Sequence, residues 1–359
     1  MTYLDYQATT PLAPEALEAM LPWLREQHAN PHSAHSAGRA AKAAVEVARD
    51  QVGIFLPAGG SVSFTGGATE AVNWAIKGVG GPVVTLTTEH AAVLDTARSL
   101  PGTFVLPVGP DGLVNLDAAR AAIKPGVKLV AAMLVNNEIG VIQPIAELAQ
   151  LAHEAGALFL CDAVQGYGRV PIPAECDLIA VSAHKIHGPK GIGALWIRDG
   201  VTFEPLLHGG AQEVAGRSGT LSPALCTGFG AAAQLMRQRA ASDAAHVEAL
   251  WRAARVALGE GWTVNGSVDA RYRGNLNVRR EGLDVARLMS DLRDIAFSAG
   301  SACASGSGRP SHVLEAIGLS EAEARTSIRI GFGRYTGEAE LTAALARIDQ
   351  AARAQRIAA

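Results

Sequence analysis

The chain has 359 residues, and its 31 basic and 34 acidic side chains leave a net charge of −3, which gives no electrostatic reason to expect nucleic acid or an anionic membrane as the main partner. Hydrophobic residues make up 48 % of the chain and charged residues 18 %, so the composition excludes a largely disordered protein. The sequence has no apolar run of about 18 residues, the length that a membrane-spanning helix needs. Its first residues do not have the basic start and apolar core of a signal peptide, and we expect a cytoplasmic protein.

Short apolar runs alternate along the chain with longer segments of helical periodicity. The first predicted helix begins at Pro14, where the missing N–H of proline costs no helical hydrogen bond. We expect helices over 14–25, 36–56, from about 68, 144–156, 223–258, 284–293, 312–318 and 338–355, and strands over 61–64, 83–87, 103–108, 128–135, 157–164, 177–183 and 193–198.

Several of these strands are apolar at consecutive positions, which is typical of parallel strands buried on both faces. Together with the strand–helix alternation, this predicts a doubly wound α/β sheet. The composition then changes, because 223–258 is Ala-rich and the segments beyond it mix short strands with helices. We therefore predict a large domain over 12–245 and a smaller α+β domain formed by 1–11 and 246–359.

The cysteines and histidines are not arranged as a metal site. The four cysteines form no C-x-x-C pair, and their spacings suit neither zinc nor a disulfide framework. His28, His32 and His35 have helical spacing, but Pro31 interrupts any helix there. We expect no bound metal.

Polar residues that directly follow predicted strands are the candidates for chemistry, because open α/β sheets bind ligands at the carboxyl ends of their strands. A glycine-containing turn at 65–70 precedes a helix and suits either a phosphate or simple helix capping. Asp162 ends an apolar strand and needs a cation, either an arginine or a protonated pyridine nitrogen. Lys185 follows another apolar strand, where a lowered pKa would suit Schiff-base chemistry. These three parts together are those that an enzyme using pyridoxal phosphate needs.

The sequence resembles the cysteine desulfurases of the class V aminotransferase group, in the branch that serves iron–sulfur cluster assembly. Eleven matching segments keep their order over nearly the whole chain. They are YLDYQATTP (3–11), NPHSAHSAGR (30–39), FTGGATEAVN (64–73), TTEHAAVL (87–94), NNEIGVIQPI (136–145), DAVQGYGRVPI (162–172), SAHKIHGPKGIGAL (182–195), HGGAQE (208–213), RSGT (217–220), SAGSACASGSG (298–308) and SIRIGFGRYT (327–336). The resemblance implies an α/β fold of type I among enzymes dependent on pyridoxal 5'-phosphate.

The resemblance also implies roles for individual residues. It makes Lys185 the residue that holds the cofactor covalently and moves the substrate Cα proton, and Asp162 the partner of the pyridine nitrogen. The remaining roles are Gln165 at the ring hydroxyl, His90 on the ring face and in proton transfer, the Ala68 backbone, Thr69, Ser182 and His184 at the phosphate, Thr220 at the phosphate of the neighbouring subunit's cofactor, and Asn137 and Arg329 at the substrate carboxylate, with Asn137 also near the ring.

Cys303 lies among small residues that can hardly pack, so we expect a mobile loop there. The resemblance makes it the nucleophile that takes sulfur from L-cysteine as a persulfide and leaves L-alanine. We read Cys161, Cys176 and Cys226 as small buried hydrophobes. The alternatives are a selenocysteine lyase, or another aminotransferase or lyase that does not use Cys303. A catalytically weak binding subunit is a further alternative, against which the presence of Lys185, Asp162 and Cys303 argues.

The implied partners are a second copy of the chain and a sulfur-acceptor protein, with no direct contact to nucleic acid or membrane. The homodimer follows from the role that the resemblance assigns to Thr220. The sequence does not identify the acceptor, and the candidates are a cluster-assembly scaffold or a protein of tRNA thiolation, cofactor sulfuration or DNA sulfuration.

Overall fold

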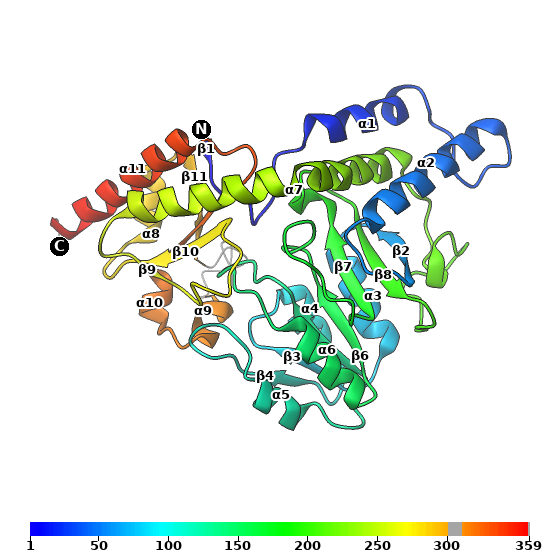
Figure 1. The fold of residues 1–359 in the computed structure, drawn as a ribbon, viewed down its shortest axis with the longest axis horizontal. Coiled ribbons are helices and arrows are strands. Elements are labelled where there is room, and N and C mark those ends of the chain that lie inside the picture. The colour runs from blue at the N-terminus through cyan, green and yellow to red at the C-terminus, as the bar shows by residue number, and fades with distance from the viewer. Residues whose placement is uncertain (301–310, 358–359) are drawn as a thin grey trace.

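The computed structural model describes residues 1–300 and 311–357 and shows two lobes, which are joined by the long helix α7 (Pro223–Leu258) (Figure 1). Ser222 caps this helix by accepting from the Leu225 N–H, and Gly259 follows its last residue. The predicted domain boundary at residue 245 falls inside α7. Because α7 contributes Phe229 to the core of one lobe and Trp251 to that of the other, the division of the chain remains a prediction.

In the described part of the chain, the large lobe is built on a seven-stranded sheet in the order β2-β8-β7-β6-β5-β3-β4. Its strands are parallel apart from β8, which is antiparallel to both of its neighbours. Their bounds are β2 Gly60–Thr65, β3 Val83–Leu86, β4 Phe104–Leu106, β5 Leu129–Met133, β6 Leu158–Asp162, β7 Leu178–Ser182 and β8 Gly193–Arg198. The mainly parallel α/β sheet agrees with the predicted fold class.

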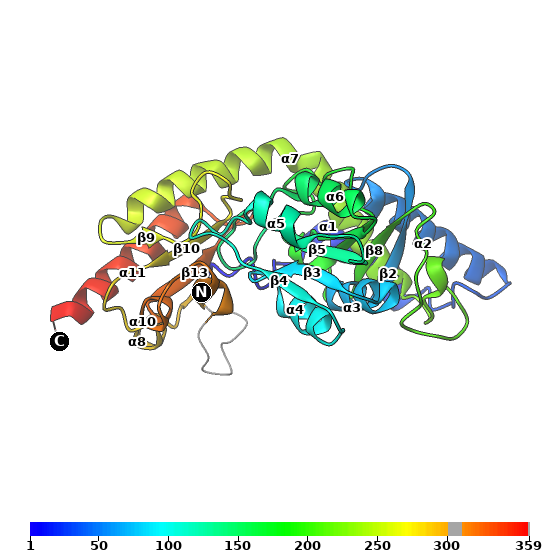
Figure 2. The same ribbon diagram turned by 90° about the horizontal axis from the view of Figure 1, so that it is seen from below.

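Helices cover both faces of this sheet, which explains why its strands are apolar at consecutive positions. In β5, Val130 and Ala132 pack in one hydrophobic cluster, while Leu129 and Ala131 pack in the cluster on the opposite face. Figure 2 shows α3 and α4 on one side of the sheet and α5, α6 and α7 on the other. The helices of this lobe are α1 Pro14–Arg25, α2 Ser36–Gly53, α3 Ala68–Val79, α4 Ala91–Arg98, α5 Leu116–Ala122 and α6 Ile145–Glu154, with 3-10 turns at Ala183–Lys185 and Val214–Gly216.

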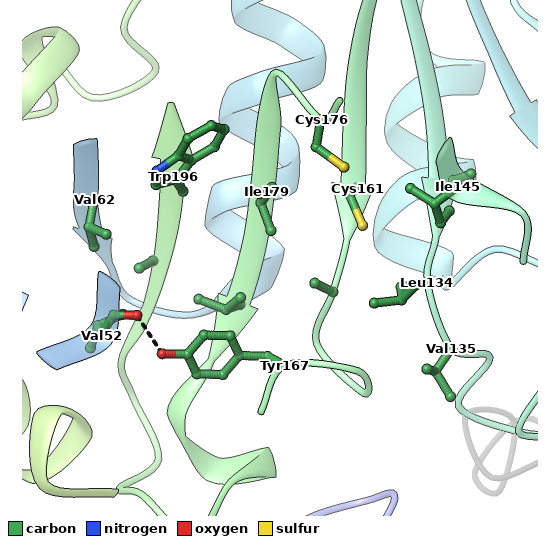
Figure 3. Close-up of a cluster of buried hydrophobic side chains, with 14 of the residues drawn as sticks. Val52, Val62, Leu134, Val135, Ile145, Cys161, Tyr167, Cys176, Ile179 and Trp196 are labelled. Atoms are coloured by element: carbon green, nitrogen blue, oxygen red, sulfur yellow. Dashed lines mark hydrogen bonds between the residues drawn. The ribbon is translucent and has the colours of Figure 1, made fainter. Parts of the chain in front are cut away.

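The larger of the two hydrophobic clusters that flank this sheet contains a buried tyrosine hydroxyl and two facing thiols (Figure 3). Tyr167 is fully buried and donates a 2.6 Å hydrogen bond to the Val52 carbonyl of α2. Cys161 and Cys176 are also fully buried, and their mutual contact together with burial raises the pKa of the Cys161 thiol. These two thiols, like the buried Cys226, are therefore core residues of the large lobe.

The small lobe has an antiparallel sheet in the order β12-β13-β10-β9 among the described residues. The N-terminal strand β1 pairs in parallel with β11, and Leu4 joins the core of this lobe. The elements of this lobe are β1 Thr2–Tyr3, β9 Thr263–Val264, β10 Asn275–Arg279, α8 Val285–Asp291, β11 Ile295–Ala296, β12 Ser298–Ala299, α9 His312–Ala316, α10 Glu321–Arg325, β13 Ser327–Gly331 and α11 Glu338–Ile357. None of the helices within the described residues is long and apolar enough to cross a bilayer.

Candidate active site

A cavity of about 610 Å³, the sheet-edge cavity, lies where the carboxyl ends of the parallel strands meet residues of the small lobe. Most of the site residues expected from the sequence line it, although they are spread over more than 250 positions. They are Ala68, Thr69, His90, Asn137, Asp162, Gln165, Ser182, His184, Lys185 and Arg329. Thr220 is exposed in a loop and is not among the lining residues, and Cys303 lies outside the described residues.

One end of the cavity is formed by the start of α3 and the end of β7. The free N–H groups of the first turn of α3 and the Thr69 hydroxyl are donors suited to a phosphate. The close approach of this turn to β8 requires glycine at 193, because a Cβ there would lie 2.8 Å from the Ala68 nitrogen. Burial, with Lys185 and Lys190 nearby, lowers the pKa of His184 to about 4, so its ring is neutral at physiological pH.

The middle of the cavity holds a buried carboxylate, Asp162, at the end of β6. Its side chain accepts a 3.0 Å hydrogen bond from the Val164 N–H, and the residue is 7 % exposed. Burial raises its pKa, which His90 and Lys185 offset only in part. A carboxylate placed in this way is stabilised by a cation at close range. The pyridinium nitrogen of pyridoxal phosphate is such a cation, so the site fits the cofactor.

Lys185 lies in the 3-10 turn that follows β7, and its Nζ reaches across to the N-terminal segment. It donates to the Gln7 carbonyl at 2.5 Å and to the Ala8 carbonyl at 2.8 Å. The Gln7 carbonyl also accepts from Gln165 Nε2 at 2.9 Å. Lys185 therefore lies next to Gln165, and both residues line the sheet-edge cavity together with Asp162.

His90 follows β3 and caps α4, because its Nδ1 accepts from the Ala92 N–H at 3.0 Å. This contact leaves the proton of the neutral ring on Nε2. Burial lowers the pKa of His90, so the ring is a neutral base at physiological pH. Its neighbour Glu89 is fully buried and accepts from the Met133 N–H, and burial raises the pKa of Glu89 well above the ordinary value.

Arg329 of β13 is the contribution of the small lobe to the cavity. Its side chain is 1 % exposed, and its Nη2 pairs with Asp5 Oδ1 at 2.8 Å. Its Nη1 donates to the Asn137 carbonyl at 3.1 Å, and its Nε has no hydrogen-bond partner among the described residues. An unpartnered guanidinium N–H next to Asn137 suits a substrate carboxylate.

Sequence reasoning missed the part that the N-terminal segment plays. Asp5 fixes Arg329, and the carbonyls of Gln7 and Ala8 hold Lys185. The segment YLDYQATTP is one of the matching motifs, yet most of these contacts use backbone carbonyls, which every residue type supplies. The acid at position 5, which directly follows Tyr3 and Leu4, was the one available signal.

The loop that carries Thr220 is tied to the phosphate end of the cavity. Arg217 Nε pairs with Glu70 Oε1 at 2.9 Å, while Glu70 Oε2 accepts from the Gly66 N–H at 2.6 Å. The pair is largely buried, so it fixes the loop relative to the first turn of α3. Thr220 directly follows Ser218 and Gly219 in this loop, and it is exposed.

Comparison with known proteins gives one family over nearly the whole chain. Residues 2–343 match the family described as aminotransferase class-V. The chain is 43 % identical to the cysteine desulfurase IscS of Rickettsia bellii over 94 % of its own length and 88 % of that relative. It superimposes on a NifS-like protein of Rickettsia africae with a TM-score of 0.90 at 29 % identity, covering 98 % of this chain and 99 % of that one.

A second solved structure, described as SspA in complex with cysteine, superimposes with a TM-score of 0.83 at 34 % identity. The superposition covers 94 % of this chain and all of the other, so the likeness includes both lobes. The ordered motifs, the fold and these comparisons agree, and the chain belongs to the cysteine desulfurases of the aminotransferase class-V family.

Proposed function

We propose that the protein converts L-cysteine to L-alanine with pyridoxal 5'-phosphate as cofactor, and that the sulfur leaves as a persulfide on Cys303. The observation that carries this proposal is the gathering of Asp162, Lys185 and Arg329 on one cavity in a chain of the cysteine desulfurase family. The related structure described with bound cysteine supports the choice of substrate.

The cofactor, when bound, supplies an electron sink for the negative charge that develops at the substrate α-carbon. Asp162 keeps the ring nitrogen charged, and Gln165 and His90 orient the ring. The first turn of α3, Ser182 and His184 hold the phosphate, and Thr220 of a second subunit completes this site in a homodimer. These assignments rest on the position of each residue in the cavity or, for Thr220, on the family motif and its exposure.

The remaining residues act on the substrate. Arg329 and Asn137 hold its carboxylate, and Lys185 takes the Cα proton. The Cys303 thiolate then attacks the substrate sulfur: a new S–S bond forms, the Cβ–S bond breaks, and its electron pair passes to carbon, which is later protonated to give L-alanine. The residues that flank 301–310 support this role, because Ser298 lies 3.3 Å from Arg329 Nη2, and His312 bonds the carbonyl of Glu89.

The persulfide is then transferred to an acceptor protein. We propose that the acceptor serves iron–sulfur cluster assembly or thiolation in the cytoplasm, in keeping with the family branch that the sequence resembles. Co-purification from the native source tests this step, because an acceptor must approach Cys303 and is expected to remain attached to a persulfide-loaded enzyme.

The decisive experiment is an anaerobic assay of the purified protein with pyridoxal phosphate, L-cysteine and a thiol reductant, beside a Cys303→Ala control. We expect alanine and sulfide in equal amounts, both lost in the control. Turnover that survives in the control refutes the persulfide role and indicates a lyase. A visible absorbance band of the bound cofactor whose wavelength changes in Lys185→Ala, where the covalent link to the lysine cannot form, checks the cofactor site independently of turnover.

A further inference from the structure

A second cavity, of about 350 Å³, lies between the two lobes on the side of α7, and we call it the interlobe cavity. Its walls come from the segment after β6, from α7 and from the segments 271–273 and 333–334. It shares no lining residue with the sheet-edge cavity. The proposed desulfurase reaction assigns no role to it.

Four arginines line this cavity, and their charges are only partly neutralised. Arg334 pairs with Asp243 at 2.6 Å, and Arg273 pairs with Glu248 at 2.5 Å. The other two, Arg169 and Arg271, have no carboxylate within ion-pair distance among the described residues. The lining therefore carries an excess of positive charge from Arg169 and Arg271. His187 in the same wall adds none, because burial lowers its pKa to about 3 and its ring is neutral.

Two of these guanidinium groups also keep unpartnered N–H donors. Arg271 is 5 % exposed and donates through Nη1 and Nη2 to backbone carbonyls at 267, 139 and 265, while its Nε has no partner within the described chain. The side chain of Arg334 is 2 % exposed, and its Nη1 is likewise without a partner there. Buried donors without acceptors are rare in folded proteins, because each loses its hydrogen bonds to water.

The rest of the lining is apolar and aromatic, including Ile142, Val170, Met236 and Tyr272. Arg169 lies over the Tyr272 ring, with its Cζ 5.3 Å from the ring centroid. An inorganic anion would satisfy the guanidinium groups but leave these walls uncovered, whereas an organic anion with an apolar body satisfies both.

We propose that the interlobe cavity binds a small organic carboxylate, whose oxygens pair with the guanidinium groups of Arg169 and Arg271 and whose apolar body lies against Met236, Val170 and Tyr272. The bound ligand contacts a wall that reaches the active site, because Arg169 donates to the carbonyls of Lys185 and Gln165. This site does not depend on the desulfurase activity, so the two proposals can fail separately.

The test is calorimetric titration of the holoenzyme with benzoate, with its neutral isostere benzamide and with inorganic phosphate. We expect benzoate to bind saturably and benzamide to bind at least tenfold more weakly. Inorganic phosphate should also bind more weakly than benzoate. Ala244 is exposed on α7 and lines the cavity, so Ala244→Phe blocks it without disturbing a core, and benzoate binding should fall at least tenfold. Ala245→Phe, at the next exposed position outside the lining, is the matched control and should bind benzoate as the unaltered protein does.

The proposal is overturned if benzoate does not bind. It is also overturned if Ala244→Phe binds benzoate as well as the control does, because the carboxylate would then lie elsewhere, as at Arg329. Equal affinity for benzamide would refute the charge argument, and tighter binding of phosphate would refute the organic ligand. Ala240→Phe at the same mouth is a second blocking variant, and retention of cofactor absorbance verifies that each variant is folded.

Discussion

Replacing Asp162 with asparagine is expected to stabilise the apoprotein slightly and to weaken cofactor binding, which are effects of opposite sign. Without cofactor, burial raises the pKa of Asp162 above the ordinary value, so the ionised carboxylate lowers the stability of the folded state at neutral pH. Asparagine keeps the shape and can still accept from the Val164 N–H, so the variant avoids this cost.

With cofactor, the same substitution removes a charge-assisted hydrogen bond to the ring nitrogen. Such bonds contribute about 1.5–3 kcal/mol. At 1.4 kcal/mol per factor of ten, this amounts to an affinity for pyridoxal phosphate lower by about 10- to 150-fold. The affinity is best measured by fluorescence titration in a Lys185→Ala background, because a covalent link to the lysine would conceal the difference.

Asp177 supplies a matched control at the opposite edge of the sheet. It is also a buried aspartate, but it bonds His153, Arg198 and the Phe159 N–H and lies far along the strands from the sheet-edge cavity. Asp177→Asn should lower the Tm of apo and holo protein alike and leave cofactor affinity unchanged. An Asp162→Asn protein whose affinity stays within threefold of the parent, or whose apo Tm falls as far as its holo Tm, would refute the reasoning.

Three further predictions concern stability. Tyr167→Phe leaves the buried Val52 carbonyl without its 2.6 Å partner and should lower the free energy of unfolding in urea by about 1–3 kcal/mol; a loss below about 0.5 kcal/mol would contradict it. Glu213→Gln removes the charge that pairs with Arg49 from a fully buried side chain and should lower the free energy of unfolding by about 3–5 kcal/mol in the same assay. A loss under about 1 kcal/mol, which is typical of exposed ion pairs, would contradict this prediction. Burial lowers the pKa of His187 from 6.5 to about 3, so the contribution of the neutral ring to stability is complete above pH 6.5 and is lost as the pH falls below that value. His187→Asn should flatten the loss of unfolding free energy between pH 6.5 and 4, and an unchanged pH profile would refute this prediction.

The local pattern of the sequence predicted the seven strands of the large sheet and the longer helices, but it missed the short helices α4, α5 and α10. The helices predicted over 14–25 and 223–258 have these bounds in the structure, because proline at the first position and glycine after the last residue of the second mark them in sequence. The strand predicted over 193–198 also has its observed bounds, but its antiparallel direction in the sheet was not predicted. The direction of a strand depends on the length and path of the connections to its neighbours. A short apolar run has the same residue pattern in a parallel and in an antiparallel strand, so it does not predict the direction.

The candidate site divides in the same way. Lys185, Asp162 and the turn at 65–70 could be selected from sequence, because a charge or a glycine turn directly after an apolar strand is costly or unusual unless a ligand uses it. The contacts of Asp5 with Arg329 and of Lys185 with the carbonyls of Gln7 and Ala8 join residues more than 170 positions apart. Such contacts depend on how the small lobe packs against the sheet edge.

What the sequence determined by itself is therefore the strands of the large sheet, the longer helices, the family and most of the site residues that line the sheet-edge cavity, because these follow from local periodicity and from motifs that carry their chemistry in residue type. Only the tertiary structure decided which backbone atoms fix Lys185, which carboxylate holds Arg329 and where the uncompensated arginines of the interlobe cavity gather. Those features arise from distances between segments that are remote in sequence, and burial, which sets the pKa of Asp162 and of His187, exists only once these segments have packed.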